Sequence, residues 1–437
     1  MKSFKKTMST FMAMTIMLSG LAACSKSDTE ETTAIDDPPP AERPEPEFKG
    51  SYNINEKPDA DYDEEAMNAA YLNYVINAFA QTSQYAEEGN YMISPASIAF
   101  AMEMTGAGAC NDTLREITDL ISEDASPEEV QAFMADLLDH YNSAEGLELE
   151  VANSVWYNSI TLGDDINPEF LDFVEEYYDA RGEALEFNAE AVEIINSWVN
   201  EKTHGMIPDI VEQSDLKAMV LINAIAFEAQ WADIIEDSQV AENQEFRNAN
   251  GEIANVTMLN DTMDNYFATD LMTGFRRYYA GGDYYFLAML PNDENMTGNE
   301  LAAQLTPEAY TEFINSVSYD YDVYTKIPEF ESDYEVQLAA MLNSMGVEQA
   351  FTPAADFTNM VINDEHQLYI GKVIHKTHIE LNQAGTRAAA ATAVTLYDAA
   401  CMINPEFREV KLDRPFAYAI VDASTDIPVF IGTVNDL

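Results

Sequence analysis

The sequence has few cysteines, histidines and basic residues, and each shortage excludes a class of function. Its 437 residues include three Cys, five His and 21 Lys plus Arg, against 78 Asp plus Glu. The formal net charge is therefore -57. A field of that sign repels DNA, RNA, polyanions and anionic membrane surfaces. We expect no nucleic-acid partner and no electrostatic attachment to a membrane.

The motifs that carry most catalytic chemistry are also absent. The chain contains no Gly-x-Ser-x-Gly, no His-Glu-x-x-His, no Gly-x-x-x-x-Gly-Lys and no Cys-x-x-Cys pattern. His375 and His378 lie three positions apart on an expected strand, so they face opposite sides and cannot share a metal ion. We therefore expect no enzyme activity, no cofactor and no metal site.

What is present begins with an export signal at residues 1–23. A basic start precedes an apolar run at residues 11–18, which is too short to remain as a membrane span. Leu21-Ala22-Ala23-Cys24 then resembles a lipobox, which predicts a lipid on Cys24. We expect a cell-envelope lipoprotein of the outer membrane, held there only by this N-terminal lipid, with its folded part outside the cytoplasm.

A proline-rich and acidic stretch separates the signal from the rest of the chain. Residues 24–50 carry Pro38-Pro39-Pro40 and few apolar side chains, which predicts a disordered tether. No internal repeat or second linker follows, so residues 51–437 are expected to form a single folded unit. Whether Cys110 and Cys401 form a disulfide or stay unpaired is left open by their spacing.

Helical periodicity dominates the first half of this unit, and strand patterns dominate the second half. The apolar spacing predicts helices at 64–81, 98–107, 167–178 and 189–203. Apolar or alternating runs predict strands at 149–157, 219–227, 284–290, 320–327, 368–381, 408–412, 417–421 and 428–434. The second helix follows a Ser94-Pro95 start signal and is apolar around most of its surface, so we expect it to be central. The order of elements favours an α+β fold.

The most informative segment is rich in alanine and begins at Gly385. Residues 385–393 read Gly-Thr-Arg-Ala-Ala-Ala-Ala-Thr-Ala, and an Ala-rich helix is the plain alternative. However, residues 385–406 are a long connection between two expected strands, and such loops are usually functional or disordered. Every second residue from Thr386 to Leu396 is small or apolar, as a buried strand face requires. The segment can therefore lie outside as a loop or enter a sheet, with Gly385 as a permissive hinge.

These features together resemble the serpin family of protease inhibitors over nearly all of residues 65–437. The Gly-Thr-x-Ala-Ala-Ala-Ala-Thr run from Gly385 is similar to the hinge of inhibitory serpins. Further similar motifs are Asn90-x-x-x-Ser94-Pro95-x-Ser97-Ile98, Asn196-x-Trp198-Val199-x-x-x-Thr203, Asn223-Ala224-x-x-Phe227-x-x-x-Trp231, His375-Lys376 and Arg414-Pro415-Phe416.

The resemblance implies a serpin fold with N-terminal helices, a large five-stranded mixed sheet A, smaller sheets B and C and an exposed reactive-centre loop. It implies a monomeric suicide-substrate inhibitor, whose partner is a target protease held in a covalent acyl complex. After cleavage the loop inserts into sheet A. Arg115 is the only Lys or Arg between Thr113 and Glu150, so we expect no heparin binding. The alternatives are a non-inhibitory serpin-fold binding or structural surface lipoprotein and, from another class, a lipoprotein for glycan or peptide uptake.

The resemblance also assigns roles to particular residues. The reactive bond is expected between Ala399 and Ala400, and the alternatives are Tyr397, Cys401 and Met402. A small residue there favours elastase-like serine proteases, whereas Tyr397 favours chymotrypsin-like ones, and papain-like cysteine proteases remain open as targets. The hinge comprises Gly385, Thr386, Ala388, Ala389, Ala390, Ala391 and Thr392.

A polar cluster under the opening sheet comprises Ser94, Ser97, Asn223 and His375, and Trp231 lies near the point where insertion begins. The chain departs from the family at Gln383, Ala384 and Arg387, where acids are usual, which puts the insertion rate in doubt. The sequence does not show whether the loop is exposed or inserted.

Overall fold

The computed structural model describes residues 49–51, 53–55, 58–86, 89–143, 148–363, 366–386 and 406–437. The chain divides into two units, Met1–Pro44 and Glu45–Leu437, and all described residues belong to the second unit. The expected signal, Cys24 and almost all of the expected tether lie outside the described residues. Among the described residues, no helix is both long enough and apolar enough to cross a membrane.

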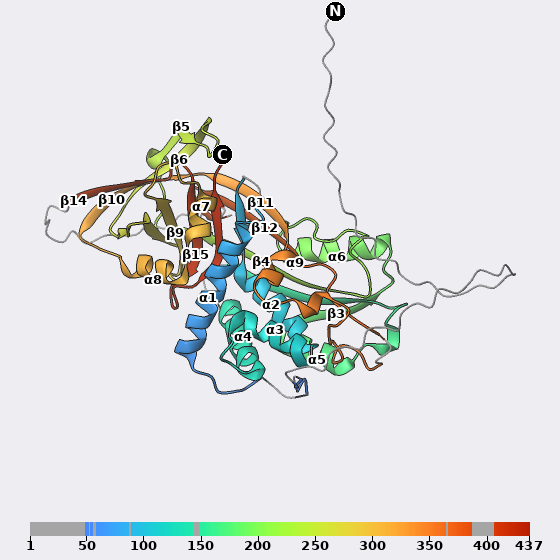
Figure 1. Cartoon of the computed structure of the whole chain (residues 1–437). Coiled ribbons are helices and arrows are strands. Elements are labelled where there is room, and N and C mark those ends of the chain that lie inside the picture. Colours follow the sequence, from blue (N-terminus) through green and yellow to red (C-terminus); the bar gives the residue numbers. More distant parts are fainter. Residues whose placement is uncertain are drawn as a thin grey trace, which may run out of the picture. The chain divides into compact units, whose positions relative to one another are not determined.

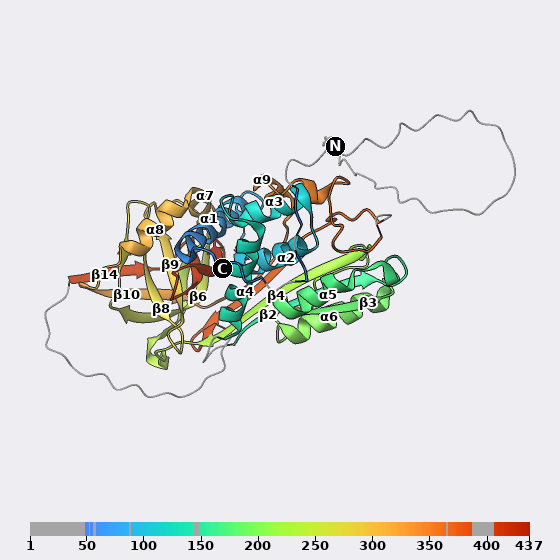
Figure 2. The ribbon, with the colours of Figure 1, turned by 90° about the horizontal axis from the view of Figure 1, so that it is seen from below.

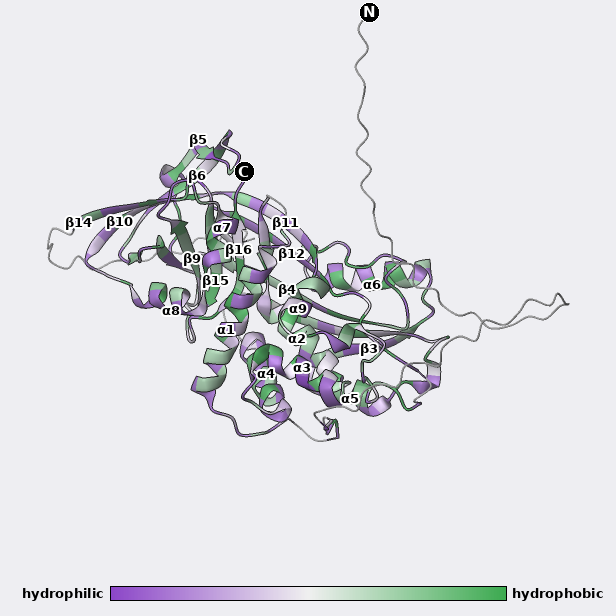
Figure 3. Cartoon of the chain, viewed as in Figure 1, coloured by the Kyte–Doolittle hydropathy of each residue, from purple (hydrophilic) through white to green (hydrophobic). Residues whose placement is uncertain are grey.

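Helices form where the sequence supplies caps and apolar stripes. Ser94 caps α2 by accepting a hydrogen bond from the Ser97 N–H, with Pro95 as the first helical residue. Ser126 and Glu129 form a capping box at the start of α4. The helices are α1 Glu64–Thr82, α2 Pro95–Ala107, α3 Asn111–Ile121, α4 Pro127–Asn142, α5 Pro168–Tyr178, α6 Ala189–Lys202, α7 Gly298–Gln304, α8 Pro307–Asn315 and α9 Ala339–Ser344. In Figure 3 the helices α3 and α4 carry both green and purple segments, as amphipathic helices do.

Three sheets account for the strands, and they correspond to the expected sheets A, B and C. Sheet A has the order β11 Phe330–Gln337, β12 Ile374–Asn382, β13 Gly385–Thr386, β4 Met219–Gln230, β2 Glu148–Asn158 and β3 Ala180–Leu185. Sheet B has the order β1 Tyr91–Ile93, β16 Pro428–Val434, β15 Phe416–Asp422, β9 Tyr284–Pro291, β8 Met272–Tyr278 and β7 Phe267–Ala268. Sheet C has the order β14 Glu406–Lys411, β10 Tyr321–Pro328, β6 Ile253–Met263 and β5 Val240–Arg247.

Sheet A is mixed, as expected, because β2 and β3 pair in parallel while its other pairs are antiparallel. The expectation of five strands is wrong, because the two-residue strand β13 makes six. It arises because Gly385 and Thr386 continue the chain directly from β12 through a two-residue turn and pair back onto it.

The helix α2 is central, which confirms the prediction from its apolar circumference. Every residue of α2 except Ala101 is buried, and α2 packs against β4 and β16. Phe227 and Val155 of sheet A join the core on the α2 side, whereas Trp156 of β2 packs in a second cluster with Trp198 of α6. Figure 2 shows α2 and α6 on opposite sides of the long strands β2 and β4. Sheet A is thus covered by helices on both faces.

The predicted strand at 368–381 is too long, because the sheet strand β12 begins only at Ile374. Residues 368–373 make isolated backbone bonds instead: the N–H of Ile370 donates to Ala350 and the carbonyl of Val373 accepts from Leu338. Sequence reasoning also omitted the strands β1, β3, β5, β6, β7, β8 and β11 and the helices α3, α4, α7, α8 and α9. The other predicted helices and strands agree with the structure to within a few residues at each end.

Candidate functional site

The first two hinge residues are part of sheet A. Thr386 pairs with Leu381 of β12 on one side and with Ala229 of β4 on the other, and Gly385 pairs with Asn382 and Gln230. Thr386 is only 2% exposed. This short strand lies between β12 and β4 in the order of sheet A, and both of these neighbours are labelled in Figure 1. The start of the hinge is therefore paired into sheet A at the end of β4.

Gly385 is required at the entry to the sheet. Its φ of 151° is one that side chains with a Cβ rarely adopt. A Cβ at this position would lie 2.1 Å from the carbonyl oxygen of Ala229. Only glycine allows the backbone to approach β4 this closely, so the hinge glycine has a steric as well as a conformational role.

Two aromatic side chains, Tyr279 and Trp231, contact the hinge and the turn that precedes it. The hydroxyl of Tyr279 lies 2.6 Å from that of Thr386, and the ring of Trp231 stacks on Tyr279 at a centroid distance of 4.7 Å. Trp231 is also tied to the turn before the hinge, because its indole N–H donates to the Asn382 carbonyl and its backbone N–H donates to the Ala384 carbonyl. Trp231, which was expected near the point where insertion begins, thus contacts the turn before the hinge, and its role in insertion stays a prediction. Tyr279 was missed, since nothing in its sequence surroundings distinguishes it from other core tyrosines.

Beyond the hinge, β4 and β12 are not paired with each other in the part of the chain that the structure describes. Each is held only from its far side, β4 by β2 and β12 by β11. Among the described residues, no strand is therefore paired to the facing edges of β4 and β12 beyond β13, and the backbone groups on such edges can pair with a further strand. This opening lies directly in line with Gly385 and Thr386.

The predicted polar cluster is only partly assembled. The backbone N–H of Ser94 donates to Nε2 of His375 over 3.0 Å, and the Ser94 hydroxyl donates to the Val429 carbonyl. Ser97 contributes its backbone N–H to the Ser94 hydroxyl oxygen. Asn223, in contrast, donates to Oδ1 of Asn153 over 2.7 Å, and no hydrogen bond joins it to His375 among the described residues.

Two groups in this cluster, the His375 imidazole and the Asn223 side-chain oxygen, bear on how the cluster would respond to an inserted strand. Burial lowers the pKa of His375 to about 4, so the imidazole is neutral and its Nε2 accepts the Ser94 N–H. Oδ1 of Asn223 is buried and has no hydrogen-bond partner within the described ranges. A buried acceptor without a donor costs about 1–3 kcal/mol, so Asn223 would gain from a donor delivered into the opening.

Comparison with known proteins decides the family. A family model described as "Serpin (serine protease inhibitor)" matches residues 69–437. The chain belongs to the serpin family. An uncharacterized serpin-like protein of Methanosarcina mazei is 30% identical, with 86% of this chain and 87% of that protein covered. The leukocyte elastase inhibitor of Bos taurus is 29% identical, with 85% and 99% covered. The crystal structure of a thermophilic serpin, tengpin, in its native state superposes with a TM-score of 0.77 at 32% identity, covering 89% of this chain and all of that one.

Many predicted site residues of this serpin lie outside the described residues. These are the hinge positions Ala388, Ala389, Ala390, Ala391 and Thr392, and the reactive-bond candidates Tyr397, Ala399, Ala400, Cys401 and Met402. Their roles stay predictions.

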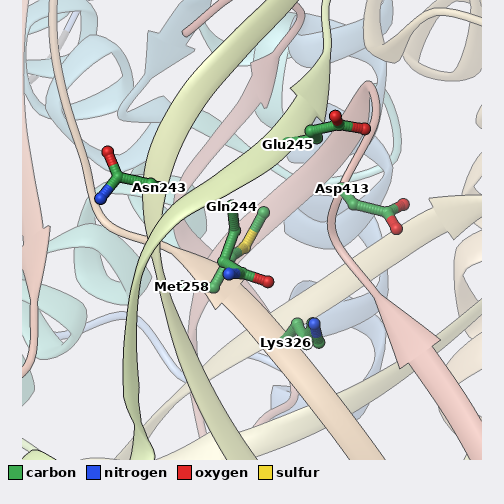
Figure 4. Close-up of a pocket in the computed structure, with 6 residues that line it drawn as sticks. All are labelled: Asn243, Gln244, Glu245, Met258, Lys326 and Asp413. Atoms are coloured by element: carbon green, nitrogen blue, oxygen red, sulfur yellow. The ribbon is translucent and has the colours of Figure 1, made fainter.

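A pocket in this serpin lies near sheet C, away from the hinge (Figure 4). Its lining comes from β5, β6 and β10 and from the turn after β14, and comprises Asn243, Gln244, Glu245, Met258, Lys326 and Asp413. Small-molecule sites are usually lined by apolar and aromatic side chains. This lining is almost wholly polar, so we assign the pocket no ligand.

Proposed function

We propose that this serpin inhibits endopeptidases as a suicide substrate, acting as a monomer and trapping the acyl-enzyme by inserting its cleaved loop into sheet A. The observation that carries the proposal is the hinge itself. Gly385 and Thr386 already form a strand between β12 and β4, in register with both. Insertion after cleavage would extend an existing strand and need not nucleate a new one.

The register of β13 predicts where each inserted residue would pair. Thr386 lies opposite Leu381 and Ala229. A strand that continued this antiparallel register would place position 388 opposite Ile379 and Phe227, and position 390 opposite Thr377 and Ile225. Position 392 would lie opposite His375 and Asn223. The residues at these three positions, Ala388, Ala390 and Thr392, are small enough for the buried face on which Thr386 lies.

Thr392 would therefore enter the polar cluster. Its hydroxyl group would bring a donor beside Oδ1 of Asn223, the buried acceptor described above. Ladder hydrogen bonds contribute about 1 kcal/mol each. Insertion over positions 387–393 would pair the new strand on both sides, so the gain would approach the roughly 5–15 kcal/mol stability of a whole domain. That free energy is available to displace an attached protease.

The trapping step follows from ordinary acyl transfer. The nucleophile of the protease attacks the carbonyl carbon of Ala399, the Ala399–Ala400 peptide bond breaks, and the new amine of Ala400 leaves with the proton from the nucleophile. The protease remains joined to Ala399 through an ester or thioester. Insertion then pulls the joined protease away from its catalytic geometry, and a displacement near 1 Å already costs about 100-fold in rate.

We infer elastase-like serine proteases as the targets. Alanine at position 399 fits a small specificity pocket, and one relative, of Bos taurus, carries the name leukocyte elastase inhibitor. If cleavage follows Tyr397 instead, a chymotrypsin-like protease fits better. Neither choice suits a protease that requires Lys or Arg at the cut.

The test is incubation of the purified protein with elastase, chymotrypsin, trypsin and a papain-like protease, followed by a denaturing gel. We expect an SDS-resistant complex with elastase and a released peptide whose mass corresponds to residues 400–437. A complex with trypsin alone, with cuts after Arg387 or Arg408, would contradict the assigned specificity. A peptide starting at residue 398 would move the reactive bond to Tyr397.

A matched variant separates inhibition from mere cleavage. Thr386→Arg places a charge on the buried face of the hinge, so we expect cleavage of the loop without a stable complex. Thr386→Ser keeps the hydroxyl and should retain the complex. If the wild-type chain is cut without forming complexes, and its unfolding temperature does not rise after the cut, the non-inhibitory alternative is correct.

We also propose that a lipid on Cys24 anchors the protein to the outer membrane. The lipobox-like Leu21-Ala22-Ala23-Cys24 supports this proposal. Metabolic labelling with a radioactive fatty acid tests it: the wild-type chain should be labelled and recovered with the membrane. A Cys24→Ala variant should be neither labelled nor processed at residue 24, whereas Cys110→Ala should behave like the wild type. Equal labelling of the Cys24→Ala variant would contradict the anchor.

A further inference from the structure

The solvent-facing side of β11 and β12 carries a dense set of charged side chains. His375, Thr377, Ile379 and Leu381 of β12 alternate inward, so the residues between them face outward. The outward set comprises Glu331, Asp333 and Glu335 of β11 and Lys376, His378 and Glu380 of β12. His375 and His378 indeed face opposite sides of sheet A. That fact excludes a site shared by the two histidines but not a site that His378 forms with acids of the neighbouring strand.

Three of these side chains converge. Asp333 and His378 are direct cross-strand partners, and Nδ1 of His378 lies 2.7 Å from Oδ1 of Asp333. Glu331 is two residues away on β11 and therefore on the same face. One ligand atom from each of the three residues lies within 4.8 Å of the other two. No other group of three His, Cys, Asp or Glu side chains is this close in the described part of the chain.

The backbone holds these groups in place. β11 and β12 pair without interruption from Phe330–Leu381 to Gln337–Ile374, so a continuous ladder fixes the spacing of the three residues along the backbone. The His378 side chain is only 12% exposed, which restricts its rotation. Preorganised ligands on rigid elements are what a metal site requires.

The charge balance also favours a cation at this end of the face. Glu335 already has a cationic partner, since Nζ of Lys376 lies 2.9 Å from its carboxylate. Glu331 is instead directly opposite Glu380, and like charges in that position destabilise a strand pair. Among the described residues, no Lys or Arg forms an ion pair with Glu331 or Asp333.

We propose that Glu331, Asp333 and His378 bind a divalent transition-metal ion of the zinc type. Ca²⁺ and Mg²⁺ prefer sites made only of oxygen, whereas one imidazole nitrogen with two carboxylate oxygens suits Zn²⁺ and its neighbours in the series. Ligands about 2.1 Å from a tetrahedral metal ion lie roughly 3.4 Å from one another. Glu331 and Asp333 are exposed, so rotation of their carboxylates can close the remaining distance.

The bound ion would join β12 to β11. The opening that receives the hinge lies on the other side of β12, beside β4. The ion therefore fixes one wall of the opening without occupying it. It should stabilise the uncut protein by mass action, and this effect does not depend on whether the protein inhibits a protease.

The test is titration of the purified full-length protein with Zn²⁺ by calorimetry, in physiological salt and excess Mg²⁺ to occupy weak acidic sites. We expect one tight site per chain. The H378N variant should bind Zn²⁺ at least roughly tenfold more weakly than the wild type. Even the loss of a residue that only hydrogen-bonds to a metal ligand typically weakens metal binding about 10–100-fold. E331Q, which preserves the shape of the side chain, should weaken the site in the same direction.

H366N is the matched control. His366 also pairs with a carboxylate, with Nε2 3.1 Å from Oδ2 of Asp165, but it has no third ligand within the described residues. H366N should bind Zn²⁺ as tightly as the wild type. Co²⁺ should give a visible absorption band that H378N loses and H366N keeps. Equal Zn²⁺ affinity in the wild type and H378N, or many weak equivalent sites in both, would overturn the proposal.

Discussion

The hydroxyl groups of Tyr279 and Thr386 lie 2.6 Å apart, although 107 residues separate them in the sequence. This contact joins the beginning of the reactive loop to the buried end of sheet A. Trp231 stacks on the far side of the Tyr279 ring and bonds to the turn that precedes the hinge. The insertion proposed above would therefore start with the hinge already bound at one point.

The first prediction concerns the strength of that contact. Tyr279→Phe and Thr386→Val each remove one hydroxyl group and leave the other buried, so each should lower the free energy of unfolding by about 1–3 kcal/mol. The double variant should lose no more free energy of unfolding than the less stable single variant, because neither buried hydroxyl group is then left without its partner. Denaturant unfolding of the four proteins measures this coupling.

Tyr310→Phe provides the control for this cycle. Tyr310 is also buried, and its hydroxyl group donates to the Asp426 carbonyl, far from the hinge in the sequence. Its effect should add to that of Thr386→Val. If Tyr279→Phe and Thr386→Val are also additive, the two hydroxyl groups do not stabilise each other.

The second prediction concerns Gly385. Gly385→Ala places a Cβ 2.1 Å from the carbonyl oxygen of Ala229 at a φ of 151°, so the two-residue strand should leave the sheet. Insertion would then have to begin from outside, and a larger share of the protein should be cut without trapping the protease. The ratio of SDS-resistant complex to cleaved protein measures this share. Gly371→Ala is the control, because a Cβ there meets nothing within 4 Å, and it should trap as the wild type does.

The sequence predicted the elements that have a strong local signal. The Ser94-Pro95 start of α2 and its apolar circumference predicted a buried helix, and the alternation after Ile374 predicted β12. These elements were predictable because a short stretch of sequence determines them. The roles of Trp231 and His375 came instead from the resemblance to the family, and they stay predictions.

Contacts between distant segments could not be predicted in this way. Asn223 of β4 donates a hydrogen bond to Asn153 of the neighbouring strand β2 and not to His375. This follows because β4 pairs with β2, whereas β4 and β12 are not paired with each other among the described residues. Tyr279 meets Thr386 only because β8 ends beside sheet A, and the Glu331–Asp333–His378 group exists only because of the register between β11 and β12. Each depends on strand pairing, which no single-sequence pattern specifies.

The third prediction concerns acid. The pKa of His375 is lowered from 6.5 to about 4 by burial, so the unfolded chain binds a proton between these values that the folded chain excludes. The contribution of His375 to stability is therefore full above pH 6.5 and is lost as the pH falls toward 4, by about 1.4 kcal/mol per pH unit. In urea unfolding, His375→Gln should lower the slope of stability against pH between 4 and 6.5 by up to about 1.4 kcal/mol per unit relative to the wild type, whereas His366→Gln should leave the wild-type slope unchanged. A slope that is unchanged in His375→Gln would show that another group causes the loss.

The fourth prediction concerns Glu103, the one acidic residue of the buried helix α2. Its Oε2 accepts a hydrogen bond from Gln131 over 3.1 Å, and Gln131 in turn accepts one from the Tyr178 hydroxyl. Oε1 of Glu103 has no partner among the described residues. Burial raises the pKa of this carboxyl group from 4.5 to about 8. A carboxylate would here be desolvated with little compensation, so the folded state holds the protonated acid.

Glu103 should therefore destabilise the protein as the solution becomes basic. Between pH 4.5 and 8 the folded chain binds a proton on Glu103 that the unfolded chain has lost, so the contribution of Glu103 to the free energy of unfolding falls as the pH rises. The fall is about 1.4 kcal/mol per pH unit and amounts to several kcal/mol across the window. Glu103→Gln keeps the shape and cannot ionise, so the variant should lack this fall between pH 4.5 and 8 and should be more stable than the wild type at pH 8. Glu169→Gln, at an exposed position of α5, should retain the wild-type slope. If Glu103→Gln also retains the wild-type pH dependence, the proton is bound by a different group. Oε1 of Glu103 would then have to receive a hydrogen bond from water or from a residue brought close by a shift of α4.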